Sequence, residues 1–154
     1  MLLTDLLSPE RVAVPLSARD KPGIIRELAT LLVDRVGGDL EDVVTAVRER
    51  EAVLSTGIGH GVAIPHGRSP TVPELAIVCG STPEPVPFDA IDGEPVRIFF
   101  MLVGPERCAG QHVKALGRIA RLVRGDALRE RLLAARTPDE FYGALAGAEA
   151  APSA

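Results

Sequence analysis

The side chains best suited to chemistry in this 154-residue chain are histidines with arginines close to them. The stretch from Ser55 to Arg68 reads STGIGHGVAIPHGR and places His66 between Pro65 and Gly67, two positions before an arginine. A neutral imidazole is a nucleophile, and a guanidinium holds anions through a fixed fork of donors. Together they suit phosphoryl transfer, and the glycine after the ring would leave it uncovered for an incoming group.

Each histidine also has a plainer interpretation. His66 could be a surface loop residue without a role. His112 lies on an apolar helical stripe, where a single histidine is more often a hydrogen-bonded core residue than a catalyst. Its position just after the strand break at Gly104 and Pro105 favours a site, because sites in open α/β sheets form where strands end. His60 lies between two glycines and is expected to be exposed.

Several other chemistries lack their sequence patterns. The glycines at 57, 59 and 61 form G-x-G-x-G, not the dinucleotide-binding G-x-G-x-x-G, and neither a Walker lysine nor a G-x-S-x-G elbow occurs. The histidines have no cysteine pair or acidic partner at ligand spacing, and Cys79 and Cys108 form no metal box or disulfide framework. We therefore expect neither a metal nor a cofactor.

Composition excludes some partners. The net charge is −4 with a pI near 5.4, and the chain has four phenylalanines, one tyrosine and no tryptophan. An acidic chain with few aromatic residues is a poor match for nucleic acids or anionic membranes. No signal peptide or apolar run long enough to cross a membrane is visible, so we expect an intracellular, cytoplasmic protein.

Two helices are predicted before the glycine-rich stretch. Asp20 is a capping residue followed by helical apolar spacing up to Gly37, and a second helix opens at Asp39. The second helix ends in the charged run 48–51, which would bring Arg50 to the neighbourhood of His66. The alternative for this run is a solvated cluster of arginines and glutamates.

The strands follow from continuous apolar runs. Residues 75–79 and 96–103 are typical of strands covered on both faces, with a turn-rich connection at 83–93. Residues 11–16 are weakly alternating and predict an edge strand, and residues 2–7 a short helical turn. The glycine-rich stretch is expected to be a loop that enters a short strand ending on His66.

The rest of the chain is predicted to be helical. A helix after Pro105 places His112 on its inward face, and two more helical segments are expected at about 126–135 and 138–145. The tail from 146 is rich in small residues and is expected to fray. We expect one α/β domain at 1–147 and a flexible tail at 148–154.

Several motifs together resemble a known family. Arg50 and Glu51 followed by STGIGHGVAIPHGR, then FDAIDGEPV at 88–96, the strand at 98–103 and Gln111-His112 are similar to the enzyme IIA proteins of the bacterial phosphoenolpyruvate-dependent phosphotransferase system, fructose/mannitol/nitrogen class. The similarity covers about residues 2–145. It implies a three-layer α/β/α sandwich around a mixed central sheet, in a single domain.

The resemblance also implies roles. His66 is the residue that is phosphorylated, at Nε2; His112 matches the second active-site histidine and Arg50 the active-site arginine. The donor would be the phosphocarrier HPr or its nitrogen-branch relative, and the acceptor the cysteine of an enzyme IIB where one exists. No metal is required, because a phosphohistidine is already an activated donor.

Three more residues of the signature are candidates for binding the phosphate or a partner: Thr56, Gly67 and Arg68. Two functions remain open. A chain with no fused IIB or HPr domain favours a nitrogen-type regulatory protein, whose phosphorylation changes its binding to a target. The alternative is a carrier in sugar uptake, and a more distant one is a binding module that is not phosphorylated.

Overall fold

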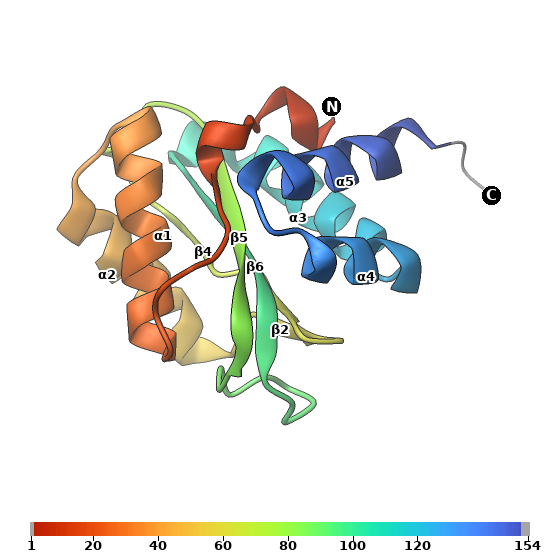
Figure 1. The fold of residues 1–154 in the computed structure, drawn as a ribbon. Coiled ribbons are helices and arrows are strands. Elements are labelled where there is room, and N and C mark those ends of the chain that lie inside the picture. The colour runs from red at the N-terminus through yellow and green to blue at the C-terminus, as the bar shows by residue number, and fades with distance from the viewer. Residues whose placement is uncertain (1, 152–154) are drawn as a thin grey trace.

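Helices cover both faces of a mixed sheet in the computed structural model, which describes residues 2–151 (Figure 1). Helices α1 (Lys21–Val36) and α2 (Leu40–Val53) lie on one face. The opposite face is covered by α3 (Ala109–Leu122), α4 (Asp126–Ala134) and α5 (Pro138–Ala150). This arrangement confirms the predicted three-layer α/β/α fold in a single domain.

The first two helices begin where their capping residues predict. The Asp20 carboxylate accepts a hydrogen bond of 2.8 Å from the backbone of Gly23, and Asp39 accepts one of 2.9 Å from the backbone of Asp42. These bonds satisfy amides that have no partner within the first turn of a helix. Gly37 ends α1 with φ of 114°, a conformation that glycine adopts without strain.

Six strands form the sheet: β1 (Val12–Ala13), β2 (Gly57–Gly59), β3 (Val62–Ala63), β4 (His66–Arg68), β5 (Ala76–Val86) and β6 (Val96–Gly104). Their order is β1-β5-β6-β3-β2, and β4 also pairs with β6. β5 and β6 are antiparallel, whereas β3 and β4 run parallel to β6. β1 is a short edge strand parallel to β5, as expected for residues 11–16.

β6 is buried on both faces, which explains its continuous apolar sequence. Its side chains alternate between two cores: Phe99, Met101 and Val103 pack with α1 and α2, and Ile98, Phe100 and Leu102 pack with α3, α4 and α5. The sheet is therefore stabilised from both sides by the burial of aliphatic and aromatic surface.

The predicted end of the strand at residues 75–79 is wrong. β5 continues to Val86 through Pro83 and Pro85, where the sequence indicates a turn. The segment 83–85 is exposed, and the pairing with β6 is irregular between Ser81 and Val86, so prolines without an amide donor are tolerated there.

The glycine-rich stretch is a hairpin, not an open loop. β2 and β3 pair in antiparallel fashion around a turn in which His60 has φ of 58°. His66 begins β4; it does not end a strand. This difference matters for the site, since β4 then lies beside the end of β6.

The start of the chain forms short helical segments, and the last helix is longer than predicted. The turn expected at residues 2–7 is the 3₁₀ helix η1 (Leu3–Asp5), followed by η2 (Pro9–Arg11). α5 runs to Ala150, so residues 148–150 of the expected tail are helical, and residues 152–154 lie outside the described residues.

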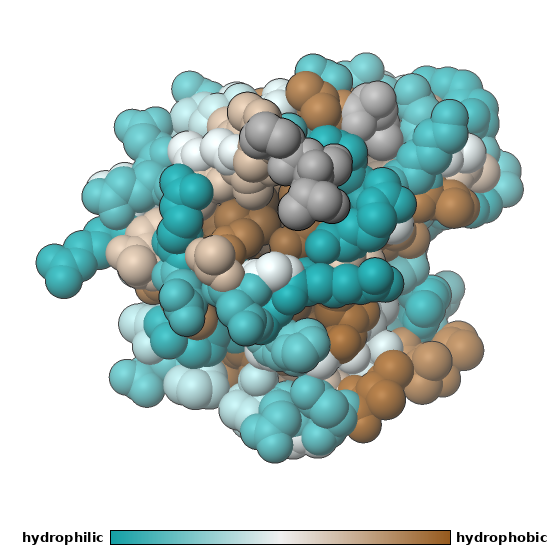
Figure 2. All heavy atoms as spheres, turned by 90° about the vertical axis from the view of Figure 1, so that its right-hand side faces the viewer, coloured by the Kyte–Doolittle hydropathy of each residue, from teal (hydrophilic) through white to brown (hydrophobic). Residues whose placement is uncertain are grey.

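Polar side chains dominate the outer surface on the side of α4 and α5, with apolar areas in separate patches (Figure 2). Among residues 2–151, every helix is too short or too polar to cross a bilayer.

Candidate functional site

β4 places His66 near the end of the central strand β6. Its residues pair with the last residues of β6, His66 opposite Leu102 and Arg68 opposite Gly104. Pro65 separates β3 from β4, and its carbonyl accepts a hydrogen bond of 3.2 Å from the backbone of Leu102. The pairing with β6 thus continues across the proline and fixes the height of the histidine.

Side chains along β4 alternate between the two helical layers. Gly67 faces α2, where a Cβ atom would lie 3.0 Å from the carbonyl carbon of Ala46 and 3.1 Å from the amide nitrogen of Val47. The glycine was expected to leave the ring uncovered. Instead, its missing side chain lets α2 pack directly on the strand, which brings the last turn of α2, with Arg50, to the site.

A pocket of about 360 Å³ lies between α2, β4 and α3. Its walls are Ala46, Arg50, His66, Gly67, Arg68, His112, Val113 and Leu116. Five of the six site residues predicted from the sequence therefore lie together. The ring centroids of His66 and His112 are 5.4 Å apart, with the ring planes inclined at 64°.

The hydrogen bonding of His66 defines its tautomer. Nδ1 of this half-buried ring lies 2.7 Å from the carbonyl oxygen of Ile64. A carbonyl only accepts, so Nδ1 carries the hydrogen and Nε2 keeps its lone pair. Burial lowers the pKa of His66; the bond to Ile64 opposes this, and the positive charge of Arg50 reinforces it. The ring is therefore neutral near neutral pH.

His112 is more deeply buried, with 4% of its surface exposed. Burial is the main cause that lowers its pKa to about 4, with further contributions from His66 and Arg68. A neutral imidazole carries one N–H and one lone pair. His112 can thus donate a hydrogen bond into the pocket without carrying a charge.

Both arginines of the pocket have acceptors. Nη1 of Arg50 donates to the carbonyl oxygen of Leu54 at 2.9 Å, just beyond the end of α2. Nη1 of Arg68 lies 2.6 Å from Oε1 of Glu106. Glu106 belongs to the 3₁₀ helix η3 (Glu106–Cys108), which connects β6 to α3.

Thr56 is the predicted site residue that lies elsewhere. It is buried outside the pocket, and both its amide and its hydroxyl donate to the carboxylate of Glu51. Glu51 is 5% exposed and pairs with Nζ of Lys21 at 2.7 Å. The threonine therefore joins the start of the hairpin to the end of α2.

Sequence reasoning gave no role to two acidic residues, Glu51 and Glu106, that pair with residues of the signature. Glu51 lies in a charged run that is typical of a solvated surface, and nothing local to it indicates burial. Glu106 directly follows Gly104-Pro105, but its partner Arg68 is 38 positions away. Within residues 2–151, no group of three or more histidine, cysteine, aspartate or glutamate side chains could hold a metal ion.

Comparison with known proteins identifies the family. The family model described as "Phosphoenolpyruvate-dependent sugar phosphotransferase system, EIIA 2" matches residues 5–147. The chain belongs to this EIIA family. The resemblance on which its signature residues were interpreted is thereby confirmed.

The relatives of this EIIA chain include regulatory and sugar-specific proteins. A nitrogen regulatory protein of Bradyrhizobium diazoefficiens is 35% identical over 146 residues, which cover 95% of each chain. The fructose-specific EIIABC component of Bacillus subtilis is 33% identical over 141 residues, 90% of this chain but 22% of that protein. The crystal structure of the nitrogen regulatory protein IIA-Ntr from Neisseria meningitidis superposes with a TM-score of 0.86 at 32% identity, covering 93% of this chain and 98% of that one.

Proposed function

We propose that this EIIA chain is a phosphoryl carrier of the nitrogen-regulatory type, which accepts a phosphoryl group on Nε2 of His66 from an HPr-type protein in the cytoplasm. The observation that carries the proposal is the bond from Nδ1 of His66 to the carbonyl of Ile64, because it leaves Nε2 as the nucleophile of a pocket that also holds Arg50 and His112.

The covalent step needs only two imidazoles, the phosphorylated one of the donor protein and that of His66. The lone pair of Nε2 attacks phosphorus, and the P–N bond of the donor breaks with its electrons staying on the donor nitrogen. The His66 ring keeps its hydrogen on Nδ1 and becomes formally cationic beside the phosphoryl group. The hydrogen bond from Nδ1 to the carbonyl of Ile64 strengthens at that moment, because the imidazole that donates it is then charged.

The pocket offers compensation for the new negative charge. A phosphoryl group brings a charge of about −1.5 to −2, by analogy with phosphorylated hydroxyls. Arg50 and Arg68 supply two positive charges in the walls, and His112 supplies an N–H donor. Positioning and electrostatic stabilisation are the main contributions that proteins make to phosphoryl transfer.

The nitrogen-regulatory assignment is supported by two relatives that are 32–35% identical and match this chain over nearly their whole length, both of them nitrogen regulatory proteins. In such a role, phosphorylation of His66 would change binding to a target protein. The second candidate is supported by the matches to a fructose-specific EIIABC component and to a fructose-specific EIIA component of Haloferax volcanii, which is 32% identical over 82% of each chain. In that role, the chain would pass the phosphoryl group to the cysteine of a IIB protein.

The test is labelling with phosphoenolpyruvate, enzyme I and HPr, followed by intact mass measurement before and after acid treatment. We expect one acid-labile phosphoryl group on the wild-type protein and none on His66→Ala. His60→Ala is the matched control, because His60 is exposed on the hairpin turn and outside the pocket wall. Labelling that persists in His66→Ala would overturn the proposal.

A second step separates the two candidates. Labelled protein is incubated with a fructose-type IIB, and the phosphoryl group is followed by mass. Rapid transfer to the IIB cysteine would support the sugar-uptake role, whereas retention on His66 supports the regulatory one.

A further inference from the structure

The guanidinium of Arg68 forms an ion pair with a carboxylate at the edge of the pocket. The guanidinium lies 2.6 Å from Glu106, and the two side chains are 41% and 80% exposed. The partners come from different elements, since Arg68 is in β4, two residues after His66, and Glu106 is in η3. The ion pair therefore bridges the strand that carries the first histidine and the segment that leads to the second.

The charge of Arg68 acts on the whole pocket. The residue forms part of the pocket wall, and its positive charge lowers the pKa of both His66 and His112. A guanidinium that influences both rings is within electrostatic reach of a group bound between them. The same side chain can thus serve either the carboxylate or a phosphoryl group.

We propose that Glu106 is a positioning residue that holds Arg68 while His66 is unphosphorylated and competes with the phosphoryl group for it. The inference rests on the proposed phosphorylation of His66. On transfer, the guanidinium exchanges one anionic partner for another, and no additional covalent step is involved.

The exchange is physically easy because the pair is exposed. Ion pairs between solvated side chains contribute little to stability, so Arg68 can leave Glu106 at low cost. The competition nevertheless has a direction: part of the gain from the contact of Arg68 with the phosphoryl group is offset by the loss of Glu106. Glu106 therefore keeps the phosphohistidine easier to discharge to an acceptor.

The experiment measures the equilibrium constant for phosphoryl exchange between HPr and this protein, by intact mass of both proteins, in four variants. These are the wild type, Glu106→Gln, Arg68→Gln and the double variant. We expect E106Q to shift the equilibrium toward phosphorylated His66 by about two- to fivefold, the range that exposed ion pairs allow. R68Q should shift it the other way, and E106Q should have no further effect in the R68Q background.

The double-variant cycle separates positioning from a general loss of negative charge. Glu84→Gln is the matched control, because Glu84 is an exposed glutamate on β5 outside the pocket wall, and it should leave the equilibrium unchanged. An unchanged equilibrium in E106Q, or an equal shift of E106Q with and without Arg68, would overturn the inference. Wild-type protein that takes no label at all would instead overturn the proposed function.

Discussion

The two imidazoles that lie side by side in this pocket are neutral, because burial and neighbouring positive charge both oppose protonation. Their centroids are 5.4 Å apart, and burial together with neighbouring positive charge lowers the pKa of both rings. A protonated His66 would have no lone pair at Nε2 and could not attack phosphorus. In the proposed reaction, this environment keeps the lone pair of His66 available, and the arginines supply positive charge for an incoming phosphoryl group.

Replacing His112 by glutamine should change how stability depends on pH. The pKa of His112 is about 4 in the folded protein, below the ordinary histidine value of about 6.5, so the unfolded chain takes up the proton first as the pH falls. Stability should therefore be fully present above the unfolded pKa and fall between about pH 6.5 and pH 4, by up to about 3 kcal/mol from this residue. Urea unfolding across this range should show a smaller loss in H112Q.

His60→Gln is the control for that experiment, because it makes the same exchange at an exposed histidine outside the pocket wall. The slope reports the difference in bound protons between the folded and unfolded states, and not the stability lost by the substitution itself. Parallel pH curves for H112Q and the wild type would show that His112 is not held neutral.

At the scale of elements, the contact between α2 and β4 decides where Arg50 lies. Gly67→Ala would add a methyl group at 3.0 Å from the backbone of Ala46. We expect a loss of about 1–3 kcal/mol in the free energy of unfolding, typical of overpacking. Labelling of His66 should also slow, because the last turn of α2 must move away. Urea unfolding and the labelling time course measure the two effects.

Gly143→Ala provides a matched glycine substitution. Gly143 lies in α5, and a Cβ there meets no atom within 4 Å. Alanine in a helix is favoured over glycine by about 0.5–1 kcal/mol, so G143A should be neutral or slightly stabilising. A G67A protein that is as stable and as rapidly labelled as G143A would contradict the packing argument.

Elements defined by local interactions could be predicted from the sequence. The caps at Asp20 and Asp39 act within three residues, so the starts of α1 and α2 were predicted correctly. β5 could not be bounded in the same way, because Pro83 and Pro85 carry a local turn signal. Whether such a segment can still extend a strand depends on its partner and on exposure, which only the folded sheet provides.

The site shows the same division. The end of the second predicted helix indicated that Arg50 lies near His66, whereas His112 was placed at the site by its position after Gly104-Pro105 and by the family resemblance. The ion pair of Arg68 with Glu106 and the burial of Glu51 were not predictable, since they depend on how separate segments meet. Thr56 belongs to the same signature, yet its hydroxyl is used by Glu51 and does not face the pocket.

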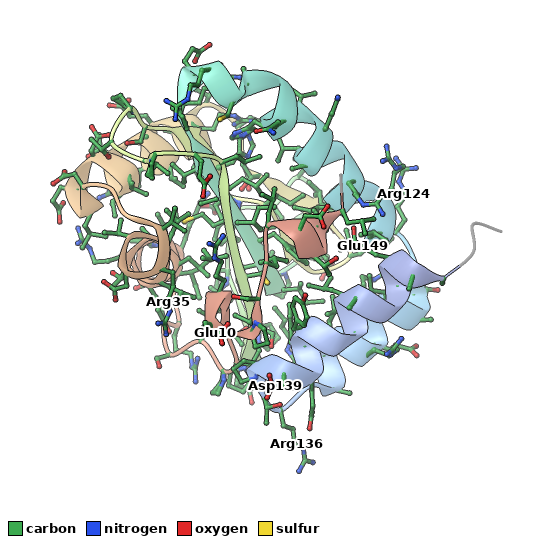
Figure 3. The ribbon with its side chains drawn as sticks, turned by 90° about the horizontal axis from the view of Figure 1, so that it is seen from above. Glu10, Arg35, Arg124, Arg136, Asp139 and Glu149 are labelled. Carbon is green, nitrogen blue, oxygen red and sulfur yellow. The ribbon has the colours of Figure 1, made fainter. Side chains whose placement is uncertain are left out.

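At the scale of the whole molecule, the last helix joins the two ends of the chain. Glu149 of α5 is labelled in Figure 3. Its carboxylate accepts hydrogen bonds from the backbone amides of Leu3 and Thr4, at 2.7 and 2.9 Å, and from Nε of Arg118 in α3 at 2.5 Å. Burial raises the pKa of Glu149, but the hydrogen bonds from these donors lower it by more, so the net shift is downward. The first segment, the last helix and the helix that carries His112 are thus held by one carboxylate.

Removing residues 148–154 should therefore destabilise the protein, although a domain boundary at 147 was expected from the sequence. The truncation deletes Glu149, whose side chain is 2% exposed, and leaves Arg118 and two amides without their acceptor. We expect a loss of about 2–4 kcal/mol in the free energy of unfolding by urea, with most of it reproduced by Glu149→Ala in the full chain. Because the pKa of Glu149 is lowered on folding, this contribution is present above the unfolded value and disappears as the pH falls through the folded one.

Glu130→Ala, at an exposed glutamate of α4, should change stability by no more than about 0.5 kcal/mol. A truncated protein as stable as E130A would restore the boundary at 147 and assign the connection through Glu149 no role in stability.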